Sequence, residues 1–419
     1  MSNFPVPKID QLAGIECYCT CYSGTGGLIK QSSEGFKVSE IIDCSVFDDL
    51  SPVQDSSHRY PLYILNKKNI DSNHAIFEIK REVGIKLKVI GIKDAKAITS
   101  QYASSEQIKN LPKEIKTMHT FLSLKGFIGK PLRKNSLQGN KFVITVYSPK
   151  TSDISSFVSD IKNIANFYGL QRFGSERLVT HLVGREIIRR NFKEAVELLL
   201  SYTTEYDSAL SKEIRHKSRD PKNYSHLLRH LPRNMDIEYQ LISAMLNGKE
   251  PISALRSIPI GIRRLFVQAY QAYIFNKCLS TALLKNERIL YGVEGDLCFE
   301  MEGPSVFGRI RRFNPSLDIH SETIPAIRIV GYAFQPGKGR FEIITKNIMD
   351  EEGISSRDFY IKEMQELSNQ GGFRQAPLCC ESFSYTGSLN LSFTLPKGSY
   401  ATILLRDLMK PKDPIKSGF

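Results

Sequence analysis

The stretch GIKDAKAITSQ, residues 91–101, places Asp94 between two segments that have the apolar alternation of a strand. The residues from Ile85 to Val89 alternate between apolar and polar, which indicates a half-buried strand. The alternation resumes at Ala97, after a break that starts with a glycine. A lone Asp after a Gly is most often a solvated turn residue. Whether Asp94 is more than that depends on the rest of the chain.

The chain has 419 residues, which predicts two domains or one discontinuous domain that carries an insertion. Hydrophobic residues make up 41% and charged residues 24%, values typical of a globular protein. No apolar run approaches the ~18 residues that span a bilayer, and the start MSNFPVPKIDQLAG lacks the apolar core of a signal peptide. We therefore expect a cytoplasmic protein, and we expect it to be a monomer.

Basic residues outnumber acidic ones, with 57 Lys and Arg against 44 Asp and Glu and a formal net charge of +13. Such an excess attracts polyanions and helps to hold phosphates, so nucleic acid is the first partner to consider. The segment RHKSRDPKNYSHLLRHLPR, residues 215–233, has the density of cations and ring side chains that suits a phosphate backbone. The alternative, a solvated and merely basic helix face, stays open.

The eight cysteines are too sparse for a disulfide scaffold in a chain of this length. In ECYCTCY, Cys17, Cys19 and Cys21 are spaced to share one face of a strand, where cysteine behaves as a small hydrophobe. His226 and His230 stand one helical turn apart in HLLRH, but leucine occupies the position at which the zinc-protease pattern has its Glu. We therefore predict no metal site.

The expected elements differ along the chain. DSNHAIFEIKREVG, residues 71–84, predicts a helix that Asp71 or Ser72 caps and that a glycine ends. Alternation in EGFKVSEII indicates a strand before it, and the strand that leads to the opening stretch follows it. Several helix patterns succeed one another from about residue 175. Strand patterns return after residue 350, and ATILLRDLM, residues 401–409, predicts a closing helix.

This order of elements predicts an α+β fold with one interrupted sheet domain. Residues 1–175 and 346–419 are expected to form the two parts of that domain. Residues 176–345 are expected to form an inserted, largely helical domain.

Common nucleotide and hydrolase motifs are missing. There is no Walker loop or GxSxG elbow, and SGTGG, residues 23–27, precedes a strand pattern where a phosphate-binding glycine loop would open a helix. What stands out instead is NFYGLQRFG, residues 166–174, which combines an amide, aromatic rings and glycines with Arg172. This composition suits stacking on a base and holding a phosphate through Arg172.

Five stretches, in order, resemble the TruD family of pseudouridine synthases. GIKDAKAITSQ resembles its GxKDxxAxTxQ motif, and NFYGLQRFG is similar to its NxxGxQRFG motif. LIK with SEGFKVSE resembles its Lys and DFxVxE segment, LRKNSLQGNKF its hairpin, and LPKGSYATILLRDL its C-terminal LPxGSxAT run. The resemblance spans residues 30 to about 408, and the long helical insertion is similar to that of archaeal and eukaryotic members.

The resemblance implies an enzyme that breaks the N1–C1′ glycosidic bond of a uridine, rotates the uracil and rejoins it through C5. It implies no cofactor and no metal. The essential carboxylate of the family falls on Asp94 and its basic partner on Lys30. A cation within ~4 to 6 Å would keep that carboxylate ionised, so we expect Lys30 and Asp94 to meet in space.

The resemblance also implies the residues that bind the uridine. Tyr168 falls on the position of the ring that stacks on the base, and Asn166 and Gln101 fall on amides at the site. Phe36 and Glu40 follow the basic residue, with a core role for Phe36 and a structural hydrogen bond for Glu40 as open alternatives. Gly35, just before them, replaces the usual Asp of the family, and we expect a looser loop there.

The fold implied is a mixed, mainly antiparallel sheet with a catalytic cleft, and the helical insertion would bind the RNA. The implied substrate is uridine 13 in the D arm of tRNA. Two alternatives remain: an RNA-binding protein without activity on the same scaffold, and a nuclease or glycosylase that uses Asp94 as its acid or base.

Overall fold

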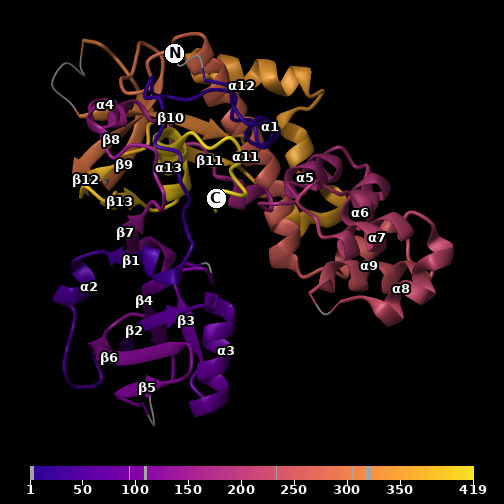
Figure 1. The fold of residues 1–419 in the computed structure, drawn as a ribbon, viewed down its shortest axis with the longest axis horizontal. Helices are drawn as coiled ribbons and strands as arrows, with labels where there is room; N and C mark the ends of the chain where they lie inside the picture. The colour runs from indigo at the N-terminus through magenta and orange to yellow at the C-terminus, as the bar shows by residue number, and fades with distance from the viewer. Residues whose placement is uncertain (1–3, 94, 108–110, 233, 304–305, 317–321) are drawn as a thin grey trace.

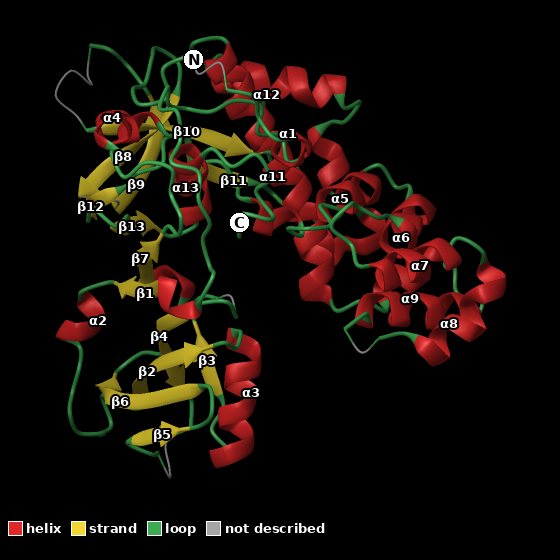
Figure 2. Ribbon diagram, viewed as in Figure 1, coloured by secondary structure: helices red, strands yellow, loops and turns green. Residues whose placement is uncertain are grey.

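The computed structural model describes residues 4–93, 95–107, 111–232, 234–303, 306–316 and 322–419. Within these ranges the chain forms two sheets and a run of helices that stands to one side of both (Figures 1 and 2). Asp94 lies outside the described residues. No described helix is long and apolar enough to cross a membrane.

The larger sheet has nine strands in the order β12-β13-β7-β1-β4-β2-β6-β5, with β3 paired to β4. The β1–β4 pair is parallel and the other pairs are antiparallel, so the expected mixed, mainly antiparallel sheet is present. Its strands are β1 (Phe36–Ile42), β2 (Tyr60–Lys68), β3 (Leu87–Val89), β4 (Ile98–Ser105), β5 (Glu114–Lys116), β6 (Thr120–Ile128), β7 (Leu137–Thr145), β12 (Glu381–Tyr385) and β13 (Asn390–Pro396).

The smaller sheet has the order β11-β10-β8-β9. Its strands are β8 (Leu297–Gly303), β9 (Val306–Arg312), β10 (Thr323–Ile329) and β11 (Gly372–Gln375). This sheet therefore takes strands from both sides of residue 345. The helices α5 to α11 precede it in one continuous run, and α11 packs both on α5 and on β10.

The helices have the following bounds: α1 (Lys8–Leu12), α2 (Ser45–Asp48), α3 (Ser72–Val83), α4 (Ser155–Asp160), α5 (Thr180–Ile188), α6 (Phe192–Ser201), α7 (Ala209–Lys217), α8 (Tyr224–His230), α9 (Asp236–Leu246), α10 (Pro251–Arg256), α11 (Ile260–Leu284), α12 (Arg340–Glu351) and α13 (Ala401–Met409). The predicted helix at residues 71–84 and the predicted closing helix at residues 401–409 are both confirmed, as α3 and α13.

Of the two candidate N-caps of α3, Asp71 and Ser72, the structure has Asp71. The Asp71 carboxylate accepts hydrogen bonds from the backbone N–H groups of Asn73 and His74, so Asp71 is the N-cap. Gly84 ends the helix in the left-handed conformation, with φ of 75°. Ser72 is fully buried and turns toward β4 instead of capping the helix.

The prediction of a strand at Cys17, Cys19 and Cys21 is wrong. Residues 17–21 lie outside the strands of the described chain, because their backbone is bound by a side chain of α13. The Asp407 carboxylate accepts from the N–H groups of Cys19 and Thr20, at 2.9 and 3.0 Å. Burial raises the pKa of Cys17 to about 12, which keeps it a thiol.

Among the described residues, no group of three or more His, Cys, Asp or Glu side chains is placed to hold a metal ion.

A buried histidine makes the stability of the helical region depend on pH. His181 of α5 is 4% exposed and lies between the rings of Phe173 and Tyr273. Burial, and then the charge of Arg185, lower its pKa to about 4, against about 6.5 in an unfolded chain. Below pH 6.5 the unfolded state binds a proton at His181, whereas His181 in the folded state stays neutral down to about pH 4. We therefore expect about 3 kcal/mol of stability to be lost as the pH falls from 6.5 to 4.

Urea unfolding at a series of pH values measures this loss. His181→Phe should remove the slope between pH 6.5 and 4, whereas His226→Phe, at an exposed position on α8, should leave it unchanged. An equal slope in wild type and His181→Phe would mean that other groups govern the acid sensitivity.

Candidate active site

One face of the strands β4, β1 and β7 forms the floor of a pocket. Val38 of β1 lies opposite Thr99 of β4 on one side and opposite Phe142 of β7 on the other. Because side chains alternate along a strand, Phe36 and Val38 share this face, as do Asn140 and Phe142. The regular two-residue period therefore brings these residues of three distant segments together.

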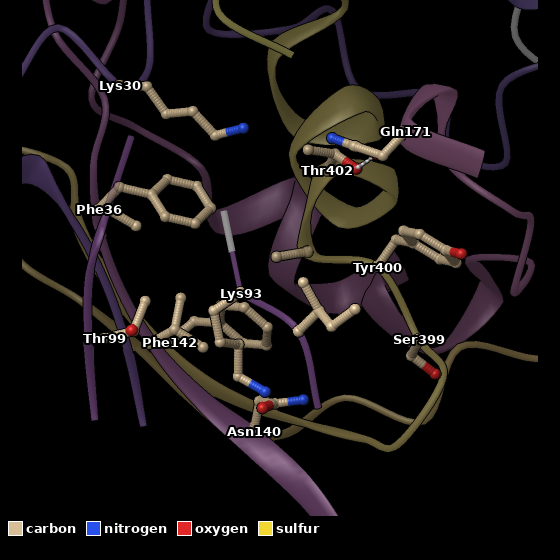
Figure 3. Close-up of a pocket in the computed structure, with 14 residues that line it drawn as sticks. Lys30, Phe36, Lys93, Thr99, Asn140, Phe142, Gln171, Ser399, Tyr400 and Thr402 are labelled. Carbon is tan, nitrogen blue, oxygen red and sulfur yellow. Dashed lines mark hydrogen bonds between the residues drawn. The ribbon is translucent and has the colours of Figure 1, made fainter. Parts of the chain in front are cut away.

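The pocket has a volume of about 300 Å³, and Figure 3 shows the side chains that line it. Above the floor it is bounded by the segment before Asp94, by Lys30 and by the start of α13. The residues that line it are Lys30, Phe36, Val38, Ile92, Lys93, Ala97, Thr99, Asn140, Phe142, Gln171, Ser399, Tyr400, Ala401 and Thr402.

The segment that leads to Asp94 is held by a buried ion pair. The ammonium of Lys93 lies 2.6 Å from Oε1 of Glu40, whose side chain has no exposed surface. The other oxygen of Glu40 accepts from the N–H of Tyr102 at 2.9 Å. A Cβ added to Gly91 would lie 2.9 Å from the Lys93 ammonium and 3.1 Å from Glu40 Oε1, so a larger residue would disturb this pair.

Two further hydrogen bonds hold the same segment. Gln101 donates through Nε2 to the carbonyl of Gly91 at 3.1 Å, and its Oε1 accepts from the Ser72 hydroxyl at 2.9 Å. The Ser72 oxygen in turn accepts from the N–H of Lys93 at 2.9 Å. Gln101 and Glu40 thus lie behind the segment, and neither lines the pocket. Their bonds support a positioning role.

Lys30 and Phe36 line the pocket. Lys30 has a left-handed backbone with φ of 56°, and its ammonium is 5.0 Å from the centre of the Phe36 ring. In Figure 3 its side chain extends into the pocket. The predicted approach of Lys30 to Asp94 stays a prediction, because residue 94 is outside the described chain.

The loop before Phe36 packs closely against Tyr147, and the expected looseness at Gly35 stays a prediction. A Cβ at Gly35 would lie 2.2 Å from the hydroxyl oxygen of Tyr147, so the Tyr147 ring fills the space of a side chain. That hydroxyl is also 3.0 Å from the Ser32 hydroxyl. The glycine therefore makes room for a contact between this loop and the segment after β7.

Tyr168 lies beside the pocket and does not line it. It is 8% exposed, and its ring packs on the edges of Phe275 and Tyr400, at centroid distances of 5.4 and 6.0 Å. The guanidinium of Arg374 is 4.1 Å from its ring centre and that of Arg172 5.5 Å. Tyr400, on which the Tyr168 ring packs, does line the pocket, as do Phe36 and Phe142.

Arg374 of β11 joins three segments around Tyr168. It donates from Nε to the carbonyl of Asn166 at 3.0 Å, from Nη2 to Asn166 Oδ1 at 2.8 Å and from Nη1 to the carbonyl of Gly398 at 2.7 Å. The Asn166 Nδ2 group donates to the carbonyl of Gln375 at 3.4 Å. Burial lowers the pKa of Arg374 from its ordinary value. Both polar ends of the Asn166 amide are thus hydrogen-bonded within the protein. Arg374 also holds the turn that precedes α13 through its bond to Gly398.

Arg172 also lies on the Tyr168 side. Its Nη1 donates to Gln268 Oε1 at 3.4 Å, and its buried Nε has no hydrogen-bond partner within the described ranges. Its neighbour Gln171 does line the pocket, where its Oε1 accepts from the hydroxyl of Thr402 at 3.2 Å.

Sequence reasoning missed several lining residues, although all of them stand in the five quoted stretches. These are Lys93, Thr99, Asn140, Gln171, Ser399, Tyr400 and Thr402. Their position within those stretches was the available signal. Arg374 lies outside the stretches, and no pattern around it indicated its role.

Comparisons with known proteins agree with this architecture. Residues 12–408 match the family model described as tRNA pseudouridine synthase D (TruD). A tRNA pseudouridine synthase D from Archaeoglobus fulgidus is 30% identical, over 96% of this chain and 99% of its own. One from Methanococcoides burtonii is 27% identical, over 98% of this chain and 99% of its own. A crystal structure described as tRNA pseudouridine synthase D (TruD) from Methanosarcina mazei has a TM-score of 0.76 at 26% identity, and the match covers 99% of this chain and 100% of that one. The chain therefore belongs to the TruD family of tRNA pseudouridine synthases, which are isomerases.

Proposed function

We propose that this enzyme isomerises uridine 13 in the D arm of tRNA, with Asp94 as the catalytic carboxylate. The observation that carries the proposal is the position of the neighbours of Asp94. Ile92 and Lys93 before it, and Ala97 after it, line the same pocket as Lys30 and Phe36. Described residues on both sides of position 94 are therefore part of the pocket wall.

The reaction needs no reagent beyond the RNA. The N1–C1′ bond breaks, the uracil turns over, and a C5–C1′ bond forms. The proton on C5 leaves and N1 gains one, so atoms and electrons balance. Asp94 would attack the sugar or remove a proton from it during cleavage, and both roles need an ionised carboxylate. We infer that the enzyme uses no cofactor and no metal.

The charge of the protein supports an extended RNA contact. Of the cations in residues 215–232, Arg219, Lys222 and Arg229 are exposed around α8. Arg215 is instead buried and forms an ion pair with Asp207 at 2.5 Å, so it stabilises the folded protein and is not available to RNA. We infer that the exposed cations of this arm, residues 176–345, hold tRNA phosphates, and that residues 1–175 and 346–419 carry the catalysis.

We further infer that the enzyme works as a monomer. We also infer that it works in the reducing cytoplasm. Within the described residues the cysteines form no disulfide, as expected for a compartment that keeps thiols reduced. Light scattering of the purified protein with and without tRNA measures the oligomeric state directly.

Lys30→Met tests the electrostatic part of the proposal. A carboxylate that loses a nearby cation holds its proton to higher pH. We expect turnover at neutral pH to fall by about 10²-fold and the acidic limb of the pH–rate profile to move to higher pH. Lys68→Met, which breaks an exposed pair with Glu34, is the control. An unshifted profile would show that Lys30 does not set the charge of the catalytic group.

Tritium release from uracil C5 tests the function itself. The purified protein should release tritium from a tRNA labelled at C5 of its uridines. A tRNA with cytidine at position 13 should release less tritium, by the amount that uridine 13 contributes. Equal release from both tRNAs would place the target elsewhere. Tight binding without release would identify a binding protein, and free uracil or cut RNA would identify a glycosylase or nuclease.

A further inference from the structure

The floor and rim of the pocket contain polar atoms whose hydrogen-bonding capacity is unused within the described chain. Thr99 Oγ1, Asn140 Oδ1 and Ser399 Oγ are buried and have no hydrogen-bond partner among the described residues. Thr99 is only 1% exposed. Folded proteins leave few such atoms unpaired, so three at one pocket indicate a ligand that supplies the missing partners.

The amide that is free to meet this ligand is that of Asn140. Both polar ends of Gln101 and of Asn166 are bonded within the protein. Gln171, the other amide at the pocket, already accepts a hydrogen bond from Thr402. Asn140 lies on β7 directly opposite Glu40 of β1, next to the buried ion pair that holds the segment before Asp94. Its place in a paired strand fixes its backbone.

We propose that Asn140 reads the Watson–Crick edge of the target uracil. Its Oδ1 accepts the N3–H of the base, and its Nδ2 donates to a neighbouring ring carbonyl. The hydroxyls of Thr99 and Ser399 supply the flanking contacts. This inference rests on the proposed function, because it names the part of the substrate that the same pocket recognises.

This contact has a consequence for the isomerisation. A half turn of the uracil about the axis through N3 and C6 exchanges N1 with C5 and exchanges the two carbonyls with each other. The N3–H group stays where it was. Asn140 therefore makes the same pair of hydrogen bonds before and after the turn, and it retains the detached base between bond cleavage and bond formation.

The experiment pairs one enzyme variant with one substrate variant. Wild type and Asn140→Ala are compared in single-turnover tritium release on a tRNA with uridine, or with 3-methyluridine, at the target position. Wild type should lose about 100-fold on 3-methyluridine, which has no N3–H. Asn140→Ala should be about 100-fold slower on uridine and show nearly equal rates on the two bases, because the contact is already gone.

Controls separate recognition from folding. The affinity for tRNA and the melting temperature of Asn140→Ala should match wild type, and Gln138→Ala, on the same strand but outside the pocket, should keep wild-type rates. Equal penalties for 3-methyluridine in wild type and Asn140→Ala would overturn the proposal. So would a wild type that turns over both bases equally, a result that does not depend on how the variant folds. A wild type that releases no tritium from any tRNA would overturn the proposed function as well.

Discussion

Asp94→Asn should abolish pseudouridine formation, with a loss of about 10⁴-fold or more in single-turnover rate. Asparagine has nearly the shape of aspartate but neither its charge nor its basicity, so it fails both as a nucleophile and as a base. Affinity for tRNA should stay within about threefold of wild type, because phosphate contacts by exposed cations dominate binding. Tritium release and filter binding on the same preparations measure the two quantities.

The matched control is Asp350→Asn, which removes an exposed carboxylate paired with Lys346 on α12. It should have wild-type activity. If Asp94→Asn retained a tenth of the wild-type rate, residue 94 would be an ordinary turn residue and another carboxylate would carry the chemistry. If the variant lost tRNA binding and activity together, its role would lie in binding.

Glu40→Gln should impair both the fold and turnover. The Lys93 side chain is only 10% exposed and the Glu40 side chain has no exposed surface, so the neutral residue leaves a buried cation without its counter-charge. Breaking such a pair costs about 3 to 5 kcal/mol. The segment that leads to Asp94 loses its anchor, and a shift of about 1 Å there lowers turnover by about 10²-fold. Urea unfolding and single-turnover rates measure the two effects.

A double variant separates the two open interpretations of Glu40. In Glu40→Leu with Lys93→Met no charge is left buried, so stability should recover most of the loss while turnover stays low. Glu34→Gln, which breaks an exposed pair with Lys68, should change little. If Glu40→Gln instead raised KM with unchanged stability, Glu40 would bind the substrate and the ion pair would not hold the segment.

The order of the motifs and the two-residue period of the strands could be predicted from the amino-acid sequence. Alternation in EGFKVSEII corresponds to β1, and the helices at residues 71–84 and 401–409 lie where their caps and apolar patterns predicted. The family was predicted on the same basis and is confirmed. These features are local or are carried by short stretches, so they do not depend on which segments meet.

The strand predicted at Cys17, Cys19 and Cys21 shows where local pattern fails. Its alternation is real, but the backbone donors at residues 19 and 20 are taken by the Asp407 carboxylate, which lies 388 residues from Cys19. A spacing pattern reports which side chains share a face. It does not report whether a neighbouring strand is present to pair with.

The sequence by itself therefore determined the fold class and the family. Only the tertiary structure decided which segments meet at the pocket and which of their side chains line it. Gln101 and Asn166 are amides in the right motifs, yet they bond to Gly91 and to Arg374, and Arg374 stands 208 residues from Asn166. The physical reason is that a buried polar group takes the partner that the fold brings within about 3 Å, and that partner comes from packing, which no single stretch of sequence encodes.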